Sequence, residues 1–137
     1  MNLLLDTHFA LWCLYDSSKL NKDCFNLLSD PNNDIYVSSS SIWEISNKHL
    51  QNPKAMPLSG SDFYEDCLNN DFYILPVQAK VMHEYEQLTL KQGAKINKDP
   101  FDRILVAQAK YYKYLLVTHD HCMKYYNEPY ILYFDFA

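Results

Sequence analysis

Glycine and long apolar runs are both scarce in this chain. It contains only two glycines in 137 residues, so few turns can depend on a left-handed backbone, and collagen-like or low-complexity compositions are excluded. No apolar stretch approaches the roughly 20 residues that a membrane-spanning helix needs. The first residues, Met1 to Leu5, run directly into an acid without the basic segment of a signal peptide. The sequence therefore predicts a soluble cytoplasmic protein with no membrane partner.

Cysteine pairs typical of zinc sites are absent as well. Cys13, Cys24, Cys67 and Cys122 are scattered and form no C-x-x-C pair, which argues against a structural zinc site and indicates no disulfide pattern. We expect reduced thiols, in keeping with a cytosolic location.

An excess of basic residues is also lacking. Lys and Arg number 12 against 17 Asp and Glu, and the net charge of −5 counts against a simple nucleic-acid-binding module. It counts less against a metal-dependent nuclease, because divalent cations neutralise an acidic site before phosphate approaches it. Three basic residues are nevertheless predicted to contact the phosphate backbone of such a substrate: Lys48, Lys98 and Arg103. Surface solvation is the simpler explanation for any single lysine.

Short apolar runs alternate with segments of helical spacing along the whole chain. Strands are expected at 3–5, 35–37, 72–75, 115–117 and 130–134. Helices are expected at 8–15, 20–28, 42–50, 63–68, 77–90 and 100–109, with a short helix after residue 120. This alternation over a length suited to one domain, 1–137, predicts an α/β protein, a three-layer α/β/α sandwich around a mostly parallel five-stranded sheet. Periodicity does not determine the order of the strands.

Acidic residues follow several of these predicted strands. Asp6 and Asp120 come directly after apolar strands, and Glu44 and Asp102 lie in the early turns of predicted helices. Because ligand sites in parallel sheets lie at the carboxyl ends of the strands, we expect these four carboxylates to converge on one edge.

Taken singly, some of these acids have a purely structural explanation. Asp99 is a good N-cap ahead of Pro100, and Asp102 and Glu44 suit the first turns of their helices. Asp6 and Asp120 are harder to explain in this way, since burial is expected there. Clustered carboxylates repel each other by about 4 kcal/mol per pair at about 4 Å and an effective dielectric of about 20, so cations would stabilise such a cluster. Oxygen ligands favour Mg²⁺ or Mn²⁺ over zinc.

Five blocks of sequence resemble those of PIN-domain proteins, and more narrowly of the VapC-type toxins of bacterial type II toxin–antitoxin systems. The resemblance spans residues 3 to about 125, and its specificity comes from the order and spacing of the blocks. They are Leu4-Leu5-Asp6-Thr7-His8, Ser40-Ser41-Ile42-Trp43-Glu44-Ile45, Lys98-Asp99-Pro100-Phe101-Asp102-Arg103, Val106-Ala107-Gln108-Ala109 and Leu116-Val117-Thr118-His119-Asp120.

This resemblance implies a ribonuclease that uses Mg²⁺ or Mn²⁺ and has a sheet in the order 3-2-1-4-5. The four acids of the family map onto Asp6, Glu44, Asp102 and Asp120 as catalytic residues and metal ligands. Thr7 and Thr118 match positions whose hydroxyls support the acids, and Asp99 matches a position where some relatives have a carboxylate and others do not. The resemblance also implies a cognate antitoxin and a homodimer, and no DNA contact is expected from the toxin alone.

The expected chemistry is attack by an activated water on an RNA phosphodiester. An ion held by Asp6, Asp102 and Asp120 would lower the pKa of that water, with Glu44 holding a metal-bound water or a second ion. No histidine is required, and surface or packing roles are expected for His8, His119 and His121. Two alternatives stay open: a catalytically inactive PIN-like binding or assembly module, and a phosphohydrolase with an aspartate nucleophile. The latter requires a second Asp two residues after Asp6, where His8 stands instead.

Overall fold

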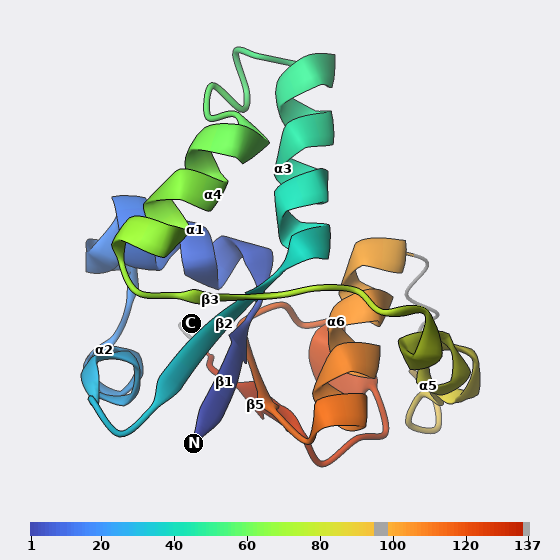
Figure 1. Cartoon of the computed structure of the whole chain (residues 1–137). Coiled ribbons are helices and arrows are strands. Elements are labelled where there is room, and N and C mark those ends of the chain that lie inside the picture. Colours follow the sequence, from blue (N-terminus) through green and yellow to red (C-terminus); the bar gives the residue numbers. More distant parts are fainter. Residues whose placement is uncertain (95–98, 136–137) are drawn as a thin grey trace.

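A parallel sheet forms the centre of the protein. The computed structural model describes residues 1–94 and 99–135, and its five strands are ordered β3-β2-β1-β4-β5 (Figure 1). The strands are β1 Asn2–Leu5, β2 Asp34–Ser38, β3 Tyr73–Leu75, β4 Leu115–Thr118 and β5 Ile131–Tyr133. Each neighbouring pair is parallel. The predicted fold class and the strand order 3-2-1-4-5 are therefore confirmed.

Helices cover both faces of this sheet. They are α1 Thr7–Tyr15, α2 Lys22–Ser29, α3 Ser39–Gln51, α4 Gly60–Asn69, α5 Met82–Gln87 and α6 Pro100–Tyr112, with the 3-10 turns η1 Ser17–Lys19, η2 Ala79–Val81 and η3 Met123–Tyr125. Side chains alternate along a strand, so Leu3 and Leu5 pack with residues of α1 to α4 while Leu4 packs with α6. This two-sided burial explains why the strand sequences are continuously apolar.

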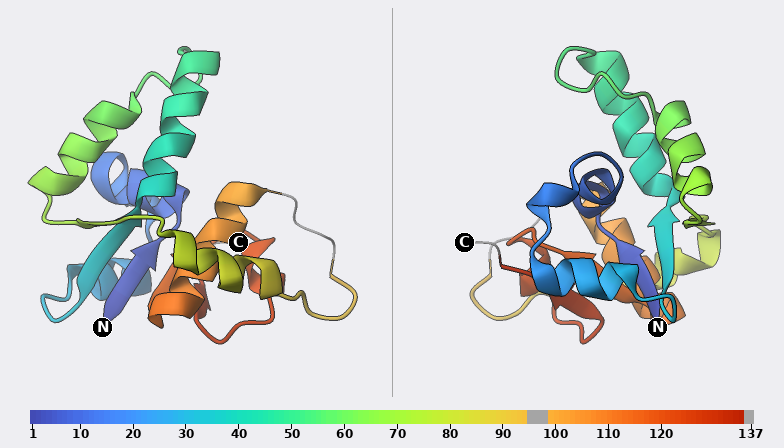
Figure 2. Two further views of the ribbon diagram at one scale, coloured as in Figure 1. Left: turned by 45° about the vertical axis from the view of Figure 1, so that its right-hand side comes forward. Right: turned by 90° about the vertical axis from the view of Figure 1, so that its left-hand side faces the viewer.

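Helices α3 and α4 form a hairpin that stands beyond the carboxyl end of β2, as both views of Figure 2 show. The two helices approach closely at Gly60, the first residue of α4. A Cβ atom at this position would lie 1.8 Å from the Ser46 Oγ and 2.7 Å from the Ile42 carbonyl oxygen. Only glycine fits between the helices here.

We expect Gly60→Ala to destabilise the fold by about 1–3 kcal/mol, the usual cost of overpacking a close contact. The Ile42 carbonyl belongs to helix backbone and cannot rotate away, so combining the change with Ser46→Ala should recover only part of the loss. Urea denaturation of the parent and the two variants measures this. An unchanged midpoint for Gly60→Ala would contradict the close approach.

The predicted helix over 77–90 is wrong in its extent. Residues 79–81 form η2, α5 ends at Gln87, and Leu88 is already extended with φ −61° and ψ 135°. The side chain of Arg103 explains the early end, because its Nε donates to the Tyr85 carbonyl at 2.9 Å and its Nη2 to the Leu88 carbonyl at 3.3 Å. A residue from α6 thus satisfies carbonyls at the end of α5, which local periodicity does not reveal.

Other helix boundaries differ by a few residues. The helix expected from residue 20 begins at Lys22 after the N-cap Asn21, and the one expected from residue 63 begins at Gly60 after the N-cap Ser59. The expected N-cap of α6 is confirmed, since the Asp99 carboxylate accepts from the Phe101 backbone N–H at 2.9 Å. None of the helices in the described ranges is long and apolar enough to cross a membrane.

Candidate active site

Asp6 lies at the carboxyl end of β1, where the chain turns into α1. Its carboxylate is 4% exposed and accepts two hydrogen bonds, one at 3.2 Å from the His8 backbone N–H and one at 2.6 Å from the Thr118 hydroxyl. The first bond makes Asp6 the N-cap of α1. Asp6 is therefore a buried acid held in one orientation from both sides.

Thr118 connects two of the predicted acids. Its buried hydroxyl donates to the Asp6 carboxylate and accepts from the Asp120 backbone N–H at 3.1 Å. The Asp120 carboxylate in turn accepts from the Cys122 backbone N–H at 2.9 Å. Through these two hydrogen bonds, Thr118 holds the Asp6 carboxylate and the backbone of Asp120 at the end of β4.

Glu44 reaches the same edge of the sheet from α3. Its Oε1 accepts from the Thr7 hydroxyl at 2.9 Å, and its Oε2 lies 3.0 Å from the Lys48 ammonium. The Thr7 hydroxyl also lies 2.8 Å from the Ser41 hydroxyl. Thr7 directly follows Asp6, so these contacts bring Glu44 next to the end of β1. Sequence reasoning did not predict the contact of Ser41 with Thr7.

Asp99 and Asp102 lie at the start of α6, Asp99 as its N-cap and Asp102 in its first turn. Partial burial, followed by the negative charges of Asp120, Asp102 and Asp99, raises the pKa of the Cys122 thiol. The charges of three of the predicted acids therefore act on the pKa of a single thiol. Sequence reasoning did not associate Cys122 with the acids.

Burial has a strong effect on Asp6 itself. Desolvation raises its pKa above the ordinary value of 3.8, the bond from Thr118 and the charge of His8 oppose that rise, and the negative charge of Asp120 adds to it. The carboxylate form of Asp6 is thus costly at neutral pH in the absence of a nearby cation.

We expect Asp6→Asn to gain stability relative to the parent as the pH rises in metal-free buffer. Because the folded-state pKa of Asp6 is raised, the fold favours the protonated carboxyl group over the carboxylate. The resulting contribution to the free energy of unfolding of the parent is fully present below pH 3.8 and is lost as the pH rises through the raised pKa. Asn has no charge to bury at any pH. Urea denaturation with EDTA, from below that pH to neutrality, measures the difference between the two proteins. A difference that does not vary with pH would contradict the raised pKa.

Two of the three predicted RNA-contacting residues have partners within the protein. Lys48 forms the ion pair with Glu44, and the Arg103 guanidinium binds backbone carbonyls and lies 5.0 Å from the centre of the Tyr85 ring. Lys98 lies outside the described residues. The RNA contacts of all three stay predictions. In the structure, Lys48 and Arg103 interact with groups of the protein itself.

His119 is packed among aromatic rings, as the packing role predicted for it requires. Its ring stacks on Trp12 at 4.2 Å with an interplanar angle of 21°, and it lies 5.8 Å from the Phe9 ring. Burial lowers its pKa. His119 therefore helps to anchor α1 against the end of β4.

The donor chemistry at this edge suits a hard divalent cation, since the acids offer only oxygen ligands and Asp6 is a buried carboxylate with Asp120 nearby. In the part of the chain that the structure describes, however, no three His, Cys, Asp or Glu side chains form a group that could hold a metal ion. Glu44 is turned toward Thr7 and Lys48. The full four-acid ligand set stays a prediction.

An apolar groove of about 550 Å³ is lined by residues of α3 and α6, among them Trp43 and Phe101, which precede Glu44 and Asp102 in the sequence. Trp43 is 62% exposed there and makes an edge contact with Phe101, with ring centres 5.0 Å apart. The groove is lined by Ser39, Ser40, Trp43, Val77, Met82, Tyr85, Pro100, Phe101 and Ile104.

Comparison with known proteins identifies the fold and the family of the chain. Among the solved structures that resemble the chain is VapBC2 from Rickettsia felis bound to a DNA fragment from its promoter, with a TM-score of 0.69, 19% identity and coverage of 98% of this chain and 100% of that chain. Another is VapBC-1 from nontypeable Haemophilus influenzae, with a TM-score of 0.59, 16% identity and coverage of 90% of each chain. At these identities they show the fold. No curated protein matches. The family model of the PIN domain matches residues 3–128, and the chain therefore belongs to the PIN-domain family.

Proposed function

We propose that this protein is a metal-dependent endoribonuclease that acts in the cytoplasm as a VapC-type toxin. The observation that carries the proposal is the bridge from Asp6 through Thr118 to Asp120 at the carboxyl edge of the sheet of a PIN-family chain. Such an arrangement keeps acidic oxygens at the place where a parallel sheet binds its ligands.

Asp6, Asp102 and Asp120 would hold Mg²⁺ or Mn²⁺, and Glu44 would complete the set. When bound, the cation supplies positive charge that lowers the pKa of a water and stabilises a phosphodiester under attack. The residues of the chain orient and support the acids: Thr118 fixes Asp6, and Thr7 fixes Glu44. The two threonines should therefore matter for cation affinity more than for the fold.

Mn²⁺ or Mg²⁺ should stabilise the purified protein, because a cation relieves the cost of the buried Asp6 charge. At about 100 times the dissociation constant, the gain is about 2.7 kcal/mol. Thermal melting with and without the cation measures it, and Asp6→Asn, which lacks the charge, should gain much less. A melting temperature of the parent that ignores both cations would remove the basis for a metal site.

The direct test is cleavage of a generic single-stranded RNA by the purified protein. We expect cleavage with Mg²⁺ or Mn²⁺, none with EDTA, and recovery when the cation is restored. A folded protein that binds RNA but never cleaves it would favour an inactive PIN-like module instead.

A cognate antitoxin is the proposed protein partner. This part of the proposal is supported by the two VapBC structures that the fold resembles, and by the exposed Trp43 in the apolar groove. An apolar segment of an antitoxin placed in this groove would lie against α3 and the start of α6, the helices that carry Glu44 and Asp102. A homodimer is proposed on the family resemblance alone.

A further inference from the structure

An exposed group of aromatic and basic side chains lies beside Asp120. We name it the β5 patch; it consists of His121, Lys124, Tyr125 and Tyr133. His121 is exposed, Tyr125 is 41% exposed, and Lys124 and Tyr133 are half-buried.

Tyr133 contacts two other members of the β5 patch, His121 and Lys124. Its hydroxyl lies 3.0 Å from the His121 Nδ1, and the two ring centres are 5.7 Å apart. The Lys124 ammonium lies 5.1 Å from the centre of the Tyr133 ring and 5.4 Å from that of Tyr125. Within residues 1–94 and 99–135, Lys124 forms no ion pair with a carboxylate. Its ammonium group contacts two aromatic rings and can therefore bind an anionic ligand.

The sheet register places the β5 patch against the candidate active site. Tyr133 in β5 pairs with Thr118 in β4, and Thr118 is the residue that donates to Asp6. Neighbouring strands lie about 4.8 Å apart, so Tyr133 is one strand spacing from this bridge. His121 directly follows Asp120. A strand of RNA that reached Asp6 and Asp120 from the β5 side would pass over the patch.

Two of the basic residues predicted to contact RNA, Lys48 and Arg103, already have partners within the protein. The Lys48 ammonium is paired with Glu44, and the Arg103 guanidinium is bound to carbonyls at the end of α5. Phosphates that approach an acidic site on a chain with a net charge of −5 need nearby positive charge. Lys124 supplies it on the β5 side, and exposed ring faces add the stacking surfaces that single-stranded nucleic acids use.

We propose that the β5 patch binds the single-stranded RNA substrate next to the cleavage site. Lys124 contacts a backbone phosphate, the rings of His121 and Tyr125 stack on unpaired bases, and Tyr133 is a positioning residue that holds His121 and Lys124. The proposal rests on the ribonuclease function proposed above. It specifies single-stranded RNA, because bases within a duplex do not offer their faces to side chains.

The test measures binding separately from cleavage. The probe is a fluorescent single-stranded RNA of about ten nucleotides, a length within the usual site size, carrying 2′-O-methyl groups to block cleavage and titrated with Ca²⁺ present. Lys124→Gln should weaken binding about five- to tenfold and reduce the slope of log Kd against log salt by about 0.7, the value for one phosphate contact on a single strand. His121→Ala combined with Tyr125→Ala should weaken it about tenfold or more. Tyr133→Phe keeps the ring beneath Lys124 and loses the bond to His121, so a smaller loss is expected.

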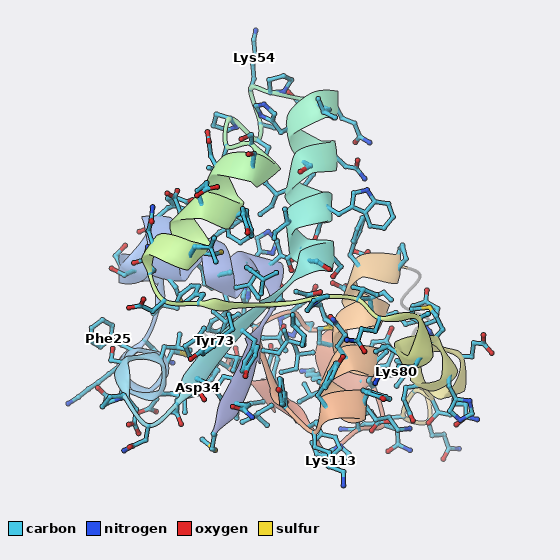
Figure 3. All side chains as sticks on the ribbon, viewed as in Figure 1. Phe25, Asp34, Lys54, Tyr73, Lys80 and Lys113 are labelled. Carbon is cyan, nitrogen blue, oxygen red and sulfur yellow. The ribbon has the colours of Figure 1, made fainter. Side chains whose placement is uncertain are left out.

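Two matched controls come from elsewhere in the protein (Figure 3). Lys80 lies 5.4 Å from the centre of the Tyr111 ring, near the end of α6 remote from Asp102, and Lys80→Gln removes the same kind of lysine–ring contact. Tyr73 is 54% exposed on β3, the opposite edge strand, and Tyr73→Ala removes a comparable tyrosine. Both variants should bind the probe like the parent.

Cleavage kinetics separate this proposal from the proposed function. Patch variants should raise KM with kcat within about twofold of the parent, since substrate binding and not the reacting acids is altered. Binding of the probe that depends on the patch in a protein without nuclease activity would overturn the function and support the patch. Active protein whose patch variants match the controls in both Kd and KM would overturn the patch alone. A parent that binds no single-stranded RNA overturns it as well.

Discussion

Asp102→Asn is expected to lose RNA cleavage by at least about a hundredfold while melting near the temperature of the parent. Its carboxylate lies in the first turn of α6, where its interaction with the helix dipole is worth at most about 1 kcal/mol to the fold. Its negative charge, like that of Asp120, raises the pKa of the Cys122 thiol. Mn²⁺ binding by this variant should be much weaker than by the parent.

Asp99→Asn is the matched control, because it makes the same change three residues earlier. Asp99 has a defined structural role as the N-cap that accepts from the Phe101 N–H, and Asn caps a helix about as well as Asp. We expect little loss of stability and only partial loss of activity. Steady-state cleavage of one RNA by both variants decides the matter: equal losses would make Asp99 a cation ligand of equal standing, and an active Asp102→Asn would overturn the assignment of Asp102.

Expression of the protein without its partner should arrest bacterial growth, and Asp6→Asn should relieve that arrest. Asn keeps the size of Asp and can still accept a hydrogen bond as the N-cap of α1, so the fold should persist while the buried negative charge is lost. Growth curves at equal protein level, checked by immunoblotting, measure the effect. The expected difference is between arrested and normal growth.

Asp23→Asn provides the control for this experiment. Asp23 is also an acid in a helix first turn, but it belongs to α2, which lies beside the start of the strands and away from their carboxyl ends (Figure 1). Growth arrest should be unchanged by this substitution. If Asp6→Asn were as toxic as the parent, either the ribonuclease function would be wrong or Asp6 would lie outside the active site.

Local sequence patterns were sufficient for most of the secondary structure. Apolar runs located all five strands within one or two residues at each end, and Asp99 with Pro100 located the start of α6. These features depend on neighbours a few residues apart, which is the range over which side-chain alternation and helix capping act. The order of the strands came from the resemblance to the PIN family, and the extent of a single domain over 1–137 stays a prediction.

The sequence by itself determined which acids follow strands or begin helices, and hence the prediction that Asp6, Glu44, Asp102 and Asp120 converge on one edge of the sheet. Only the tertiary structure decided how they are held: Thr118 donates to Asp6 across 112 positions of sequence, and Thr7 donates to Glu44 across 37. It also decided that Arg103 satisfies carbonyls at the end of α5, which stops the helix that periodicity extended to residue 90. The physical reason is that such contacts join groups distant in the chain, and their formation depends on which strands become neighbours in the sheet. Periodicity of side chains carries no information about that choice.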